Sequence, residues 1–270
     1  MYFICPVCKK ELERGEHTCR CENNHCFDIS RKGTINLLRS QKSSHGDDKL
    51  MVNARKNFLN KGYYLPLLDV LKREVLSVSG KTPVILDCGC GECWYTAEIF
   101  EHLQKNNINP NFFGIDVSKD AIFSGASRNK SIKLAVATVF DVPLKEMSCD
   151  IIISLFAPFS REEYIRLLKD GGYFITAFPM ENHLWELKKA VYDTPYKNEV
   201  QDMEIEGFKL IDKEIVHTEI NLCTNEDILS LFSMTPYYYK TSKNDMDKLS
   251  RLSSLKTQIH FCTAVYKKIT

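Results

Sequence analysis

Strand-like and helix-like segments alternate from Pro83 onward, and this alternation limits the fold more than any other feature of the chain. Buried strands are predicted at residues 84–87, 111–116, 133–137, 150–154 and 173–177. Helices are predicted between them at residues 95–103, 118–127 and 161–168. Strands that are each followed by a helix form a parallel sheet covered on both faces. The pattern therefore predicts an α/β, doubly wound, Rossmann-like sheet.

The two ends of the chain depart from this alternation. Near the C-terminus we predict strands at residues 208–220 and 257–266, with a helix from Asn225 between them. Before Pro83, helical periodicity covers residues 51–59 and 65–76, and residues 39–50 are polar and linker-like. We therefore predict a small N-terminal module at 1–38, a linker at 39–50 and an α/β domain at 51–270.

Composition limits the number of domains, the cellular location and the role of the cysteines. The chain has 270 residues, which is enough for one large domain with a small appendage. No apolar run approaches the 18 residues of a membrane span, and a cysteine at position 5 leaves no room for a signal peptide. We expect a cytoplasmic protein without a membrane partner. Eleven cysteines in a reducing compartment indicate metal ligands or core residues rather than disulfides.

Five of these cysteines fall within the first 26 residues, and their spacing predicts a zinc site. Cys5 and Cys8 form a C-x2-C pair, and Cys21 and His25 form a C-x3-H pair twelve residues later. Two close pairs of this kind are typical of a tetrahedral zinc site. Four protein ligands leave no open position, so we expect a structural ion. The nearby Cys19 and Cys26 remain alternatives to Cys21 or His25.

A glycine-rich loop follows the first predicted strand of the sheet. It carries Asp87 at the strand end, then Gly89 and Gly91, then Glu92, and a helix follows. The third glycine of a dinucleotide-binding G-x-G-x-x-G loop is absent, because Trp94 occupies its place. An acidic strand end followed by G-x-G instead suits S-adenosyl-L-methionine, whose amino-acid and ribose portions would lie over the two glycines.

Further candidate residues follow the later strands. Asp116 ends the second strand, where an acidic side chain can accept hydrogen bonds from both ribose hydroxyls or cap the next helix. The carboxyl ends of parallel strands open onto one ligand crevice. We therefore expect Phe156, Ala157 and Pro158 to flank an acceptor, with Asp141 on the preceding loop. The Asp141 carboxylate and the carbonyls of residues 156–158 are the two candidates to take up a proton that the acceptor loses, and the sequence does not decide between them. His183 follows the fifth strand and is a weaker candidate, since most loop histidines serve neither cofactor nor substrate.

Ordered motifs along almost the whole chain resemble the bacterial 23S rRNA (guanine-N1)-methyltransferases. The N-terminal motifs are Cys5-Pro-x-Cys8, Cys21-x3-His25-x-Phe-Asp and Gly33-x2-Asn-Leu-Leu38. The central ones are Gly46-Asp, Ala54-Arg55-x2-Phe58-Leu, Gly62-x-Tyr64-x-Pro-Leu, Leu86-Asp-x-Gly-Cys-Gly-Glu92-x2-Tyr95-Thr and Gly114-x-Asp-Val-Ser-Lys119. The later ones are Ala157-Pro158, Gly171-Gly172, His183-Leu-x-Glu-Leu-Lys188 and Met234-Thr-Pro236.

This resemblance implies a class I methyltransferase that moves a methyl group from S-adenosyl-L-methionine to N1 of one guanine in a 23S rRNA hairpin. It implies cofactor contacts at Tyr64, Gly91, Glu92 and His183, and zinc ligands at Cys5, Cys8, Cys21 and His25. The resemblance leaves open which guanine is modified and whether the enzyme is a homodimer. Cys93 departs from the family, where many relatives carry glycine, and a side chain there is expected to narrow the cofactor loop.

Charge distribution adds an expectation about RNA. Residues 1–62 contain 12 Lys and Arg against 7 Asp and Glu, whereas the remainder contains 24 against 28. A basic N-terminal part favours a polyanionic partner. We expect the RNA to contact the zinc module and its basic flank, at Arg20, Arg31, Lys32, Arg39 and Lys42, with Arg55 and Lys56 nearby.

Two other functions are compatible with the motifs. One is a small-molecule methyltransferase with a purely structural zinc module, which would not need the basic N-terminal part. The other is a non-catalytic RNA-binding protein with a degenerate cofactor loop, of which Cys93 would be the sign. Titration with S-adenosyl-L-methionine separates the second of these from the enzymes.

Overall fold

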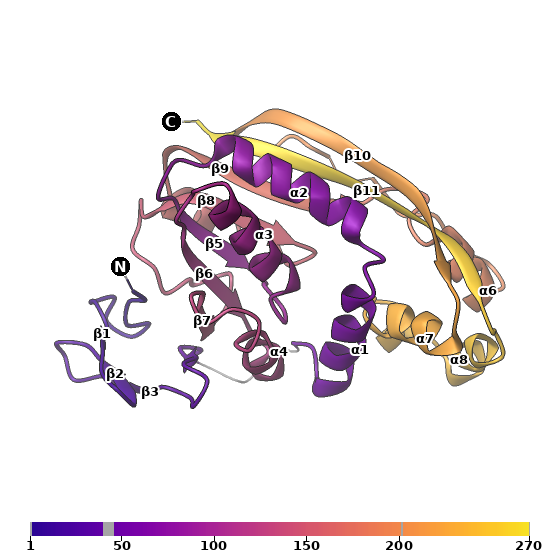
Figure 1. The fold of residues 1–270 in the computed structure, drawn as a ribbon, viewed down its shortest axis with the longest axis horizontal. Coiled ribbons are helices and arrows are strands. Elements are labelled where there is room, and N and C mark those ends of the chain that lie inside the picture. Colours follow the sequence, from indigo (N-terminus) through magenta and orange to yellow (C-terminus); the bar gives the residue numbers. More distant parts are fainter. Residues whose placement is uncertain (1, 40–45, 201, 270) are drawn as a thin grey trace.

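A computed structural model describes residues 2–39, 46–200 and 202–269, and its central element is an eight-stranded mixed sheet (Figure 1). The strand order is β10-β11-β9-β8-β5-β6-β7-β4. Six strands, from β4 to β9, are parallel. They are β4 (Ile35–Asn36), β5 (Val84–Cys88), β6 (Asn111–Asp116), β7 (Lys133–Val136), β8 (Cys149–Leu155) and β9 (Leu168–Pro179). The antiparallel β11 (Leu255–Lys268) pairs with β9 and with β10 (Phe208–Leu222).

Alternating side chains along the central strands build two separate cores. Ile85, Phe112 and Ile151 point into one core, whereas their neighbours Leu86, Phe113 and Ile152 point into the other. Since both faces are apolar, both must be covered, as in other parallel sheets. The first face packs against α2 (Leu65–Val78) and α3 (Trp94–Lys105), and the second packs against α5 (Arg161–Leu167) and the N-terminal module.

The N-terminal module is built on a small antiparallel sheet of β1 (Glu13–Arg14), β2 (Thr18–Arg20) and β3 (Cys26–Asp28). Its last strand, β4, leaves this sheet and pairs with β7 at the edge of the large one. Phe3 packs edge-on against Phe113 with a centroid distance of 5.3 Å, and Ile4 N donates to the Pro143 carbonyl at 2.9 Å. The module is therefore part of the second core rather than a separate body.

The remaining helices surround the open end of the sheet. Helix α1 (Lys49–Asn60) packs against α7 (Asn225–Ser233), and α4 (Lys119–Gly125) follows β6. Asp48 caps α1 by accepting from Met51 N at 2.9 Å, so the helix begins two residues before its predicted start. Of the predicted linker, residues 40–45, which include the expected RNA contact Lys42, lie outside the described residues. Gly46 packs against Ser118, so this end of the linker is part of the fold.

The predicted strands and helices of the α/β pattern are all present, with ends that shift by a few residues. Helices α6 (Trp185–Val191) and α8 (Lys243–Ser250) were not predicted. They have seven and eight residues and lie outside the alternation of strands and helices that located the equally short α4 and α5, and α6 packs against β11. None of the helices in the described part of the chain is long and apolar enough to cross a membrane.

Candidate active site and metal centre

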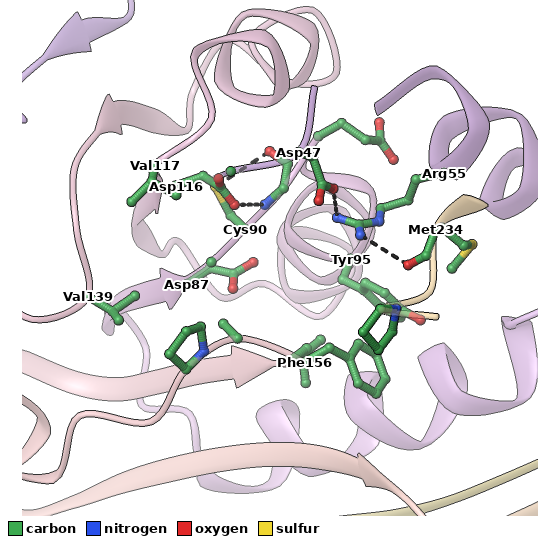
Figure 2. A pocket seen from close by; sticks show the side chains of 18 of the residues that line it. Asp47, Arg55, Asp87, Cys90, Tyr95, Asp116, Val117, Val139, Phe156 and Met234 are labelled. Atoms are coloured by element: carbon green, nitrogen blue, oxygen red, sulfur yellow. Dashed lines mark hydrogen bonds and ion pairs between the residues drawn. The ribbon is translucent and has the colours of Figure 1, made fainter. Parts of the chain in front are cut away.

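The carboxyl ends of the parallel strands open onto a cavity of about 800 Å³ (Figure 2). Residues from the predicted linker, α1, the strand-end loops and the segment after α7 line it. All of the predicted cofactor and acceptor residues line this one cavity: Tyr64, Asp87, Gly89, Gly91, Glu92, Asp116, Asp141, Phe156, Ala157, Pro158 and His183. The structure thus brings these residues together, while their individual roles stay predictions.

Asp87 stands in β5 with one oxygen satisfied and one not. Its Oδ2 accepts a 2.6 Å hydrogen bond from the Thr96 hydroxyl on α3, whereas Oδ1 is buried and has no partner among the described residues. Burial raises the pKa of Asp87 to about 7, the Thr96 hydrogen bond opposes this rise, and the nearby Asp116 charge adds to it. A buried carboxylate oxygen without a partner is costly unless a ligand supplies one.

Asp116 ends β6 and holds the glycine loop. Its Oδ2 accepts from Gly91 N at 2.9 Å, and its Oδ1 accepts from Ser118 N at 2.8 Å. Burial raises the pKa of Asp116, and these two hydrogen bonds oppose the rise. The helix cap that follows is Ser118, whose hydroxyl accepts from Ala121 N. Each carboxylate oxygen keeps a second lone pair, so Asp116 can still accept from ribose hydroxyls.

The glycine loop packs closely on the loop after β8. Gly89 has φ +79°, and a Cβ there would collide with the Cβ of Ala157. Phe156, next to Ala157, has φ +60°, a strained conformation for an aromatic residue. The residue is 51 % exposed, and its ring centroid lies 5.3 Å from that of Phe261. The strained backbone therefore holds an exposed aromatic ring at the cavity.

An ion pair holds the Glu92 side chain in place. Its Oε2 forms a 2.5 Å ion pair with Arg128, while Oε1 is buried without a partner among the described residues. Burial raises the pKa of Glu92 and Arg128 opposes this. The neighbouring Cys93 does not line the cavity; its Sγ lies 3.6 Å from Cys90 Sγ, and Gly125 of α4 leaves space for it. The expected narrowing of the cofactor loop by Cys93 is therefore wrong, since its side chain fills the core behind the loop.

Tyr64 and His183 form the aromatic side of the cavity. The Tyr64 ring lies between Phe58 and Phe261, with centroid distances of 5.0 and 5.2 Å. His183 is buried 4.1 Å from the Phe261 centroid, and its Nδ1 accepts from His260 N at 3.2 Å. Burial lowers the pKa of His183 to about 3, with a further contribution from Lys188. His183 is therefore neutral, and its proton is on Nε2 because Nδ1 accepts.

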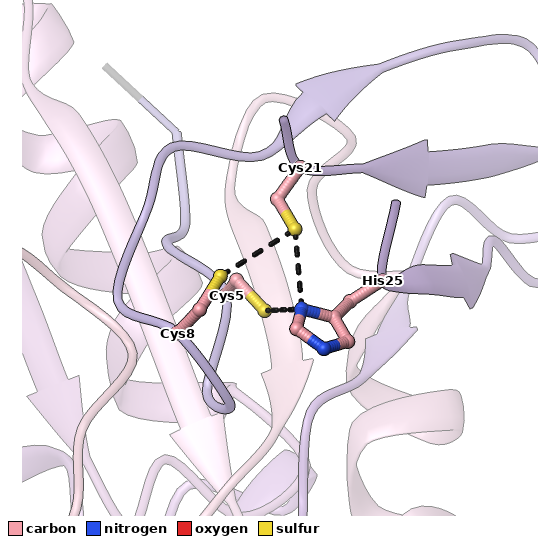
Figure 3. Close-up of side chains that lie close together, drawn as sticks. All are labelled: Cys5, Cys8, Cys21 and His25. Carbon is pink, nitrogen blue, oxygen red and sulfur yellow. Dashed lines mark hydrogen bonds between the residues drawn. The ribbon is translucent and has the colours of Figure 1, made fainter. Parts of the chain in front are cut away.

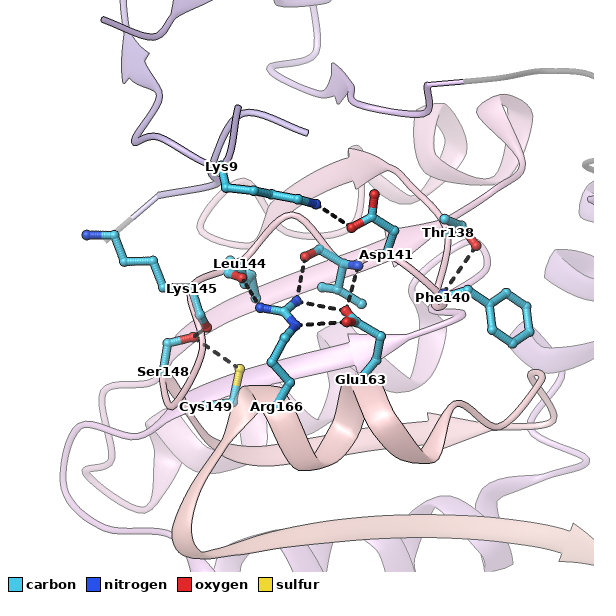
Figure 4. Close-up of polar contacts among 11 residues, drawn as sticks. Lys9, Thr138, Phe140, Asp141, Leu144, Lys145, Ser148, Cys149, Glu163 and Arg166 are labelled. Atoms are coloured by element: carbon cyan, nitrogen blue, oxygen red, sulfur yellow. Dashed lines mark hydrogen bonds and ion pairs between the residues drawn. The ribbon is translucent and has the colours of Figure 1, made fainter. Parts of the chain in front are cut away.

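Asp141 lies on the loop after β7, where the N-terminal module contacts it (Figure 4). Lys9, which directly follows Cys8, forms an ion pair with the Asp141 carboxylate. Glu163 and Arg166 of α5 hold this loop: Glu163 accepts from Val142 N at 2.9 Å, and Arg166 donates to the Val142 carbonyl at 3.0 Å. Asp141 is therefore held in place from two sides.

Several cavity residues were not assigned to the site from the sequence. Asp47 forms a 2.5 Å ion pair with Arg55, whose guanidinium also faces the Met234 carbonyl at 3.5 Å (Figure 2). The buried Tyr95 hydroxyl has no hydrogen-bond partner among the described residues. All four residues stand within the ordered motifs of the sequence, so position in a motif was the signal that could have found them.

The charge of the cavity fits S-adenosyl-L-methionine. Among its carboxylates, Asp47, Glu92 and Asp141 have cationic partners, but Asp87 and Asp116 form no ion pair with any described residue. Buried carboxylates without counter-charges favour a cationic ligand. Beside Asp116, Val117 and Val139 offer apolar walls for an adenine ring. Arg55 also lines the cavity and can bind an anionic group of the same ligand. The residues present therefore suit a ligand with two positive charges and one carboxylate.

The four predicted metal ligands meet in the N-terminal module (Figure 3). Their ligand atoms lie within 4.8 Å of one another. His25 Nδ1 lies 3.6 Å from Cys5 Sγ and 3.4 Å from Cys21 Sγ, and Cys8 Sγ lies 3.6 Å from Cys21 Sγ. A tetrahedral site with Zn–S bonds of about 2.3 Å requires edges of about 3.8 Å. The residues therefore fit a zinc ion held by four protein ligands.

The two alternative cysteines lie outside this group. Cys19 is buried in the middle of β2, opposite Phe27 of β3, and Cys26 at the start of β3 is exposed. The β2–β3 pairing places both away from the four ligand atoms.

Two family models match the chain. One, described as "RlmA, N-terminal" with a zinc ribbon, matches residues 3–45, and the other, described as "Methyltransferase domain", matches residues 79–233. The crystal structure of protein BH2331 from Bacillus halodurans C-125 aligns with a TM-score of 0.50 and 12 % identity, over 74 % of this chain and 98 % of that one. At that identity the likeness shows the fold alone.

Two curated relatives are similar over most of their length. The "23S rRNA (guanine(748)-N(1))-methyltransferase" of Streptomyces fradiae is 32 % identical over 193 residues, covering 70 % of this chain and 68 % of the relative. The Bacillus subtilis (strain 168) protein named "Putative 23S rRNA (guanine-N(1)-)-methyltransferase YxjB" is 29 % identical over 280 residues, covering 94 % and 92 %.

Proposed function

Because this chain belongs to the 23S rRNA (guanine-N1)-methyltransferase family, with a class I methyltransferase fold and a zinc-ribbon module, we propose that it transfers a methyl group from S-adenosyl-L-methionine to N1 of one guanine in a 23S rRNA hairpin. One observation carries the proposal from the family to this chain. Every residue predicted to serve the cofactor or the acceptor lines one cavity at the carboxyl end of the sheet.

The cofactor would lie over the glycine loop. Asp116 would accept from the ribose hydroxyls, and Asp87 would face the positively charged part of the cofactor. Gly89 and Gly91 would allow close approach of the backbone. When bound, S-adenosyl-L-methionine supplies an electrophilic methyl group on a sulfonium. His183 would donate from Nε2 to a carbonyl or carboxylate oxygen, since its Nδ1 already accepts from His260.

The acceptor base would enter beside the loop after β8. A guanine in a helix cannot present N1, because that atom is paired, so the base must be extruded. Phe156 offers an exposed ring on which an extruded base can stack, at a position fixed by the strained backbone. Positioning of this kind can supply much of the rate of a transfer between two bound groups.

Removal of the N1 proton needs an acceptor, and Asp141 is the candidate. His183 cannot fill this role because Nδ1 is occupied and Nε2 carries a proton. Asp141 borders the cavity and is held by Lys9. We expect Asp141→Asn to lower the single-turnover methylation rate by about 100-fold with little effect on cofactor affinity. An unchanged rate at every pH between 6 and 9 would remove Asp141 from the mechanism.

The proposal as a whole is tested with unmodified 23S rRNA and labelled S-adenosyl-L-methionine. N1 methylation blocks base pairing, so primer extension should stop next to a single guanine and give its position. Transfer of the label to RNA without such a stop would contradict N1 as the acceptor. Binding of the cofactor without labelling of any RNA would contradict the RNA substrate.

A further inference from the structure

A second cavity, of about 310 Å³, lies where the N-terminal module meets the edge of the large sheet. The module contributes Tyr2, Arg14 and residues 32–34, and the domain contributes residues of the turn after α4 and of the start of β7. This cavity is separate from the cofactor crevice, with which it shares no lining residue. Its lining residues are Tyr2, Arg14, Lys32, Gly33, Thr34, Ala126, Asn129, Lys130, Ser131, Ile132, Lys133 and Leu134.

The charge of this cavity is of one sign. Arg14, Lys32, Lys130 and Lys133 line it, and none of its lining residues in the described part of the chain is acidic. Arg14, Lys32 and Lys130 form no ion pair with any residue that the structure describes. The two other lysines of the module both have acidic partners: Lys9 pairs with Asp141 and Lys10 with Glu22. Three cations that form no ion pair with the described residues, around a small space, create a site for an anion.

Hydrogen bonds fix two of these cations, and neutral polar side chains complete the site. Arg14 is oriented by the Tyr2 hydroxyl, to which it donates at 2.6 Å. Lys32 donates to the Phe123 carbonyl at 3.0 Å and to the Ser127 hydroxyl at 2.7 Å, and its ammonium group lies 4.0 Å from the Phe123 ring centroid, which fixes its charge at the junction with α4. Asn129 and Ser131 add polar groups to the domain side. Arginine, lysine and such polar groups are the usual partners of phosphate oxygens.

From these observations we propose that the second cavity binds a backbone phosphate of the RNA substrate. The inference rests on the proposed function, because it takes the polyanion to be the RNA whose guanine is methylated. Strand β7 connects the two sites: Lys133 begins it, and Thr138 of the crevice follows its end. At about 3.3 Å per residue the two positions are at most about 17 Å apart along the chain. One RNA hairpin can therefore occupy both.

A phosphate held here would set the register of the RNA. Phosphate contacts position a nucleic acid without reading its sequence, whereas the crevice reads the extruded base. Because both the zinc module and the methyltransferase domain contribute cations, the phosphate would also hold the two parts together around the substrate. This gives the module a task that its metal site, with four protein ligands, does not explain.

The test measures RNA binding as a function of salt for Lys130→Gln, Arg14→Gln and the double variant. Lys130 is exposed on a turn, so its replacement leaves the fold intact, and zinc content checks the module in the Arg14 variant. We expect the double variant to bind the rRNA hairpin about tenfold more weakly at 0.1 M salt. The slope of log K against log salt should become shallower by about 1 to 2, with unchanged cofactor affinity. Lys105→Gln, an exposed lysine that lines neither cavity, is the matched control.

Four outcomes would overturn the inference. Wild-type affinity and slope in the variants would show that the cavity does not hold RNA, even if the wild type produces the primer-extension stop. Equal losses in Lys105→Gln would show a general charge effect. Competition by inorganic phosphate without any change in RNA affinity in the variants would assign the cavity to free phosphate. A wild type that neither binds nor methylates the RNA would overturn the proposed function together with this inference.

Discussion

The metal centre and the crevice are both built from residues that the sequence marks clearly, but they differ in completeness. The four ligand atoms of the metal centre face one another within 4.8 Å and need only one ion. The crevice leaves Asp87 and Asp116 without cationic partners among the described residues and holds Phe156 in a strained conformation. A complete set of ligands stabilises a fold, whereas an incomplete and strained set marks a place that a ligand must complete.

The two regions are nevertheless connected. Lys9 follows a zinc ligand and pairs with Asp141 at the crevice, and β4 of the module extends the large sheet. Loss of the metal centre should therefore lower the rate of RNA methylation, whereas substitutions in the crevice should leave the zinc content unchanged. Four predictions test this asymmetry, from the largest expected effect to the smallest.

The largest effect is expected from loss of a metal ligand. Cys21→Ser should release the zinc, because structural zinc contributes on the order of 10 kcal/mol to the folding of small modules. RNA methylation should fall more than 100-fold, while cofactor affinity, measured by calorimetry, should change only a few-fold. Cys26→Ser is the matched control, since Cys26 is exposed and outside the cluster. Zinc loss from Cys26→Ser, or full activity without zinc, would contradict the comparison.

A glycine of the crevice should have the next largest effect. Gly89→Ala places a Cβ against Ala157 at a φ of +79°, so the loop must shift away from its position under the cofactor. We expect cofactor affinity to fall at least 30-fold, with full zinc content by metal analysis. Gly80→Ala is the control, because a Cβ at Gly80 meets nothing within 4 Å. Normal cofactor binding by Gly89→Ala would mean that the ligand lies elsewhere in the cavity.

The charge of Asp87 should make cofactor binding depend on pH. Its pKa in the free protein is raised to about 7, so the carboxyl is mostly protonated at pH 6 and ionised at pH 8. A cationic ligand prefers the ionised form, and affinity should therefore rise up to about tenfold from pH 6 to pH 8. Asp87→Asn should bind weakly and show a much flatter profile by calorimetry. A wild-type affinity that falls over this range would contradict a cationic ligand at Asp87.

Glu74 is a buried carboxylate outside both the metal centre and the crevice. We expect its replacement to have the smallest effect of the four. It accepts from the Thr263 hydroxyl, its Oε2 has no partner among the described residues, and burial raises its pKa to about 7. A raised carboxyl pKa means that the folded state binds more protons, so its contribution to stability is lost as pH rises from about 4.5 to 7. Glu74→Gln should therefore stabilise the protein at pH 8 by about 1 to 3 kcal/mol, and hardly at pH 4.

The measurement is thermal or denaturant unfolding at the two pH values, with cofactor titration alongside. Asp87→Asn should also gain stability at pH 8 but lose cofactor affinity, whereas Glu74→Gln should keep it. A loss of cofactor affinity in Glu74→Gln would mean that a buried charge alone does not distinguish the crevice from the core.

Much of the crevice was predictable because it depends on strand ends. Hydrophobic runs located β5 and β6, and parallel strands necessarily bring their last residues, including Asp87 and Asp116, to the same edge. The Cys and His spacing located the metal centre for a similar reason, because two short loops can converge on one ion. Spacing did not exclude Cys19 and Cys26; the pairing of β2 with β3 did.

Contacts between distant segments were not predictable in this way. The Asp47–Arg55 pair at the cavity depends on how the segment before α1 folds back over Ser118, and the Lys9–Asp141 pair joins residues 132 positions apart. Cys93 was misjudged because its neighbour in space, Gly125, belongs to the next helix along the chain.

The sequence by itself determined the strands and helices of the α/β pattern, the glycine loop, the metal ligand pairs and the family, because each of these depends on residues that are close together in the chain or in a fixed order. Only the tertiary structure decided which groups lack a partner, which cations share a cavity and how the zinc module meets the sheet. These features depend on packing between segments far apart in sequence, and neither local periodicity nor spacing carries that information.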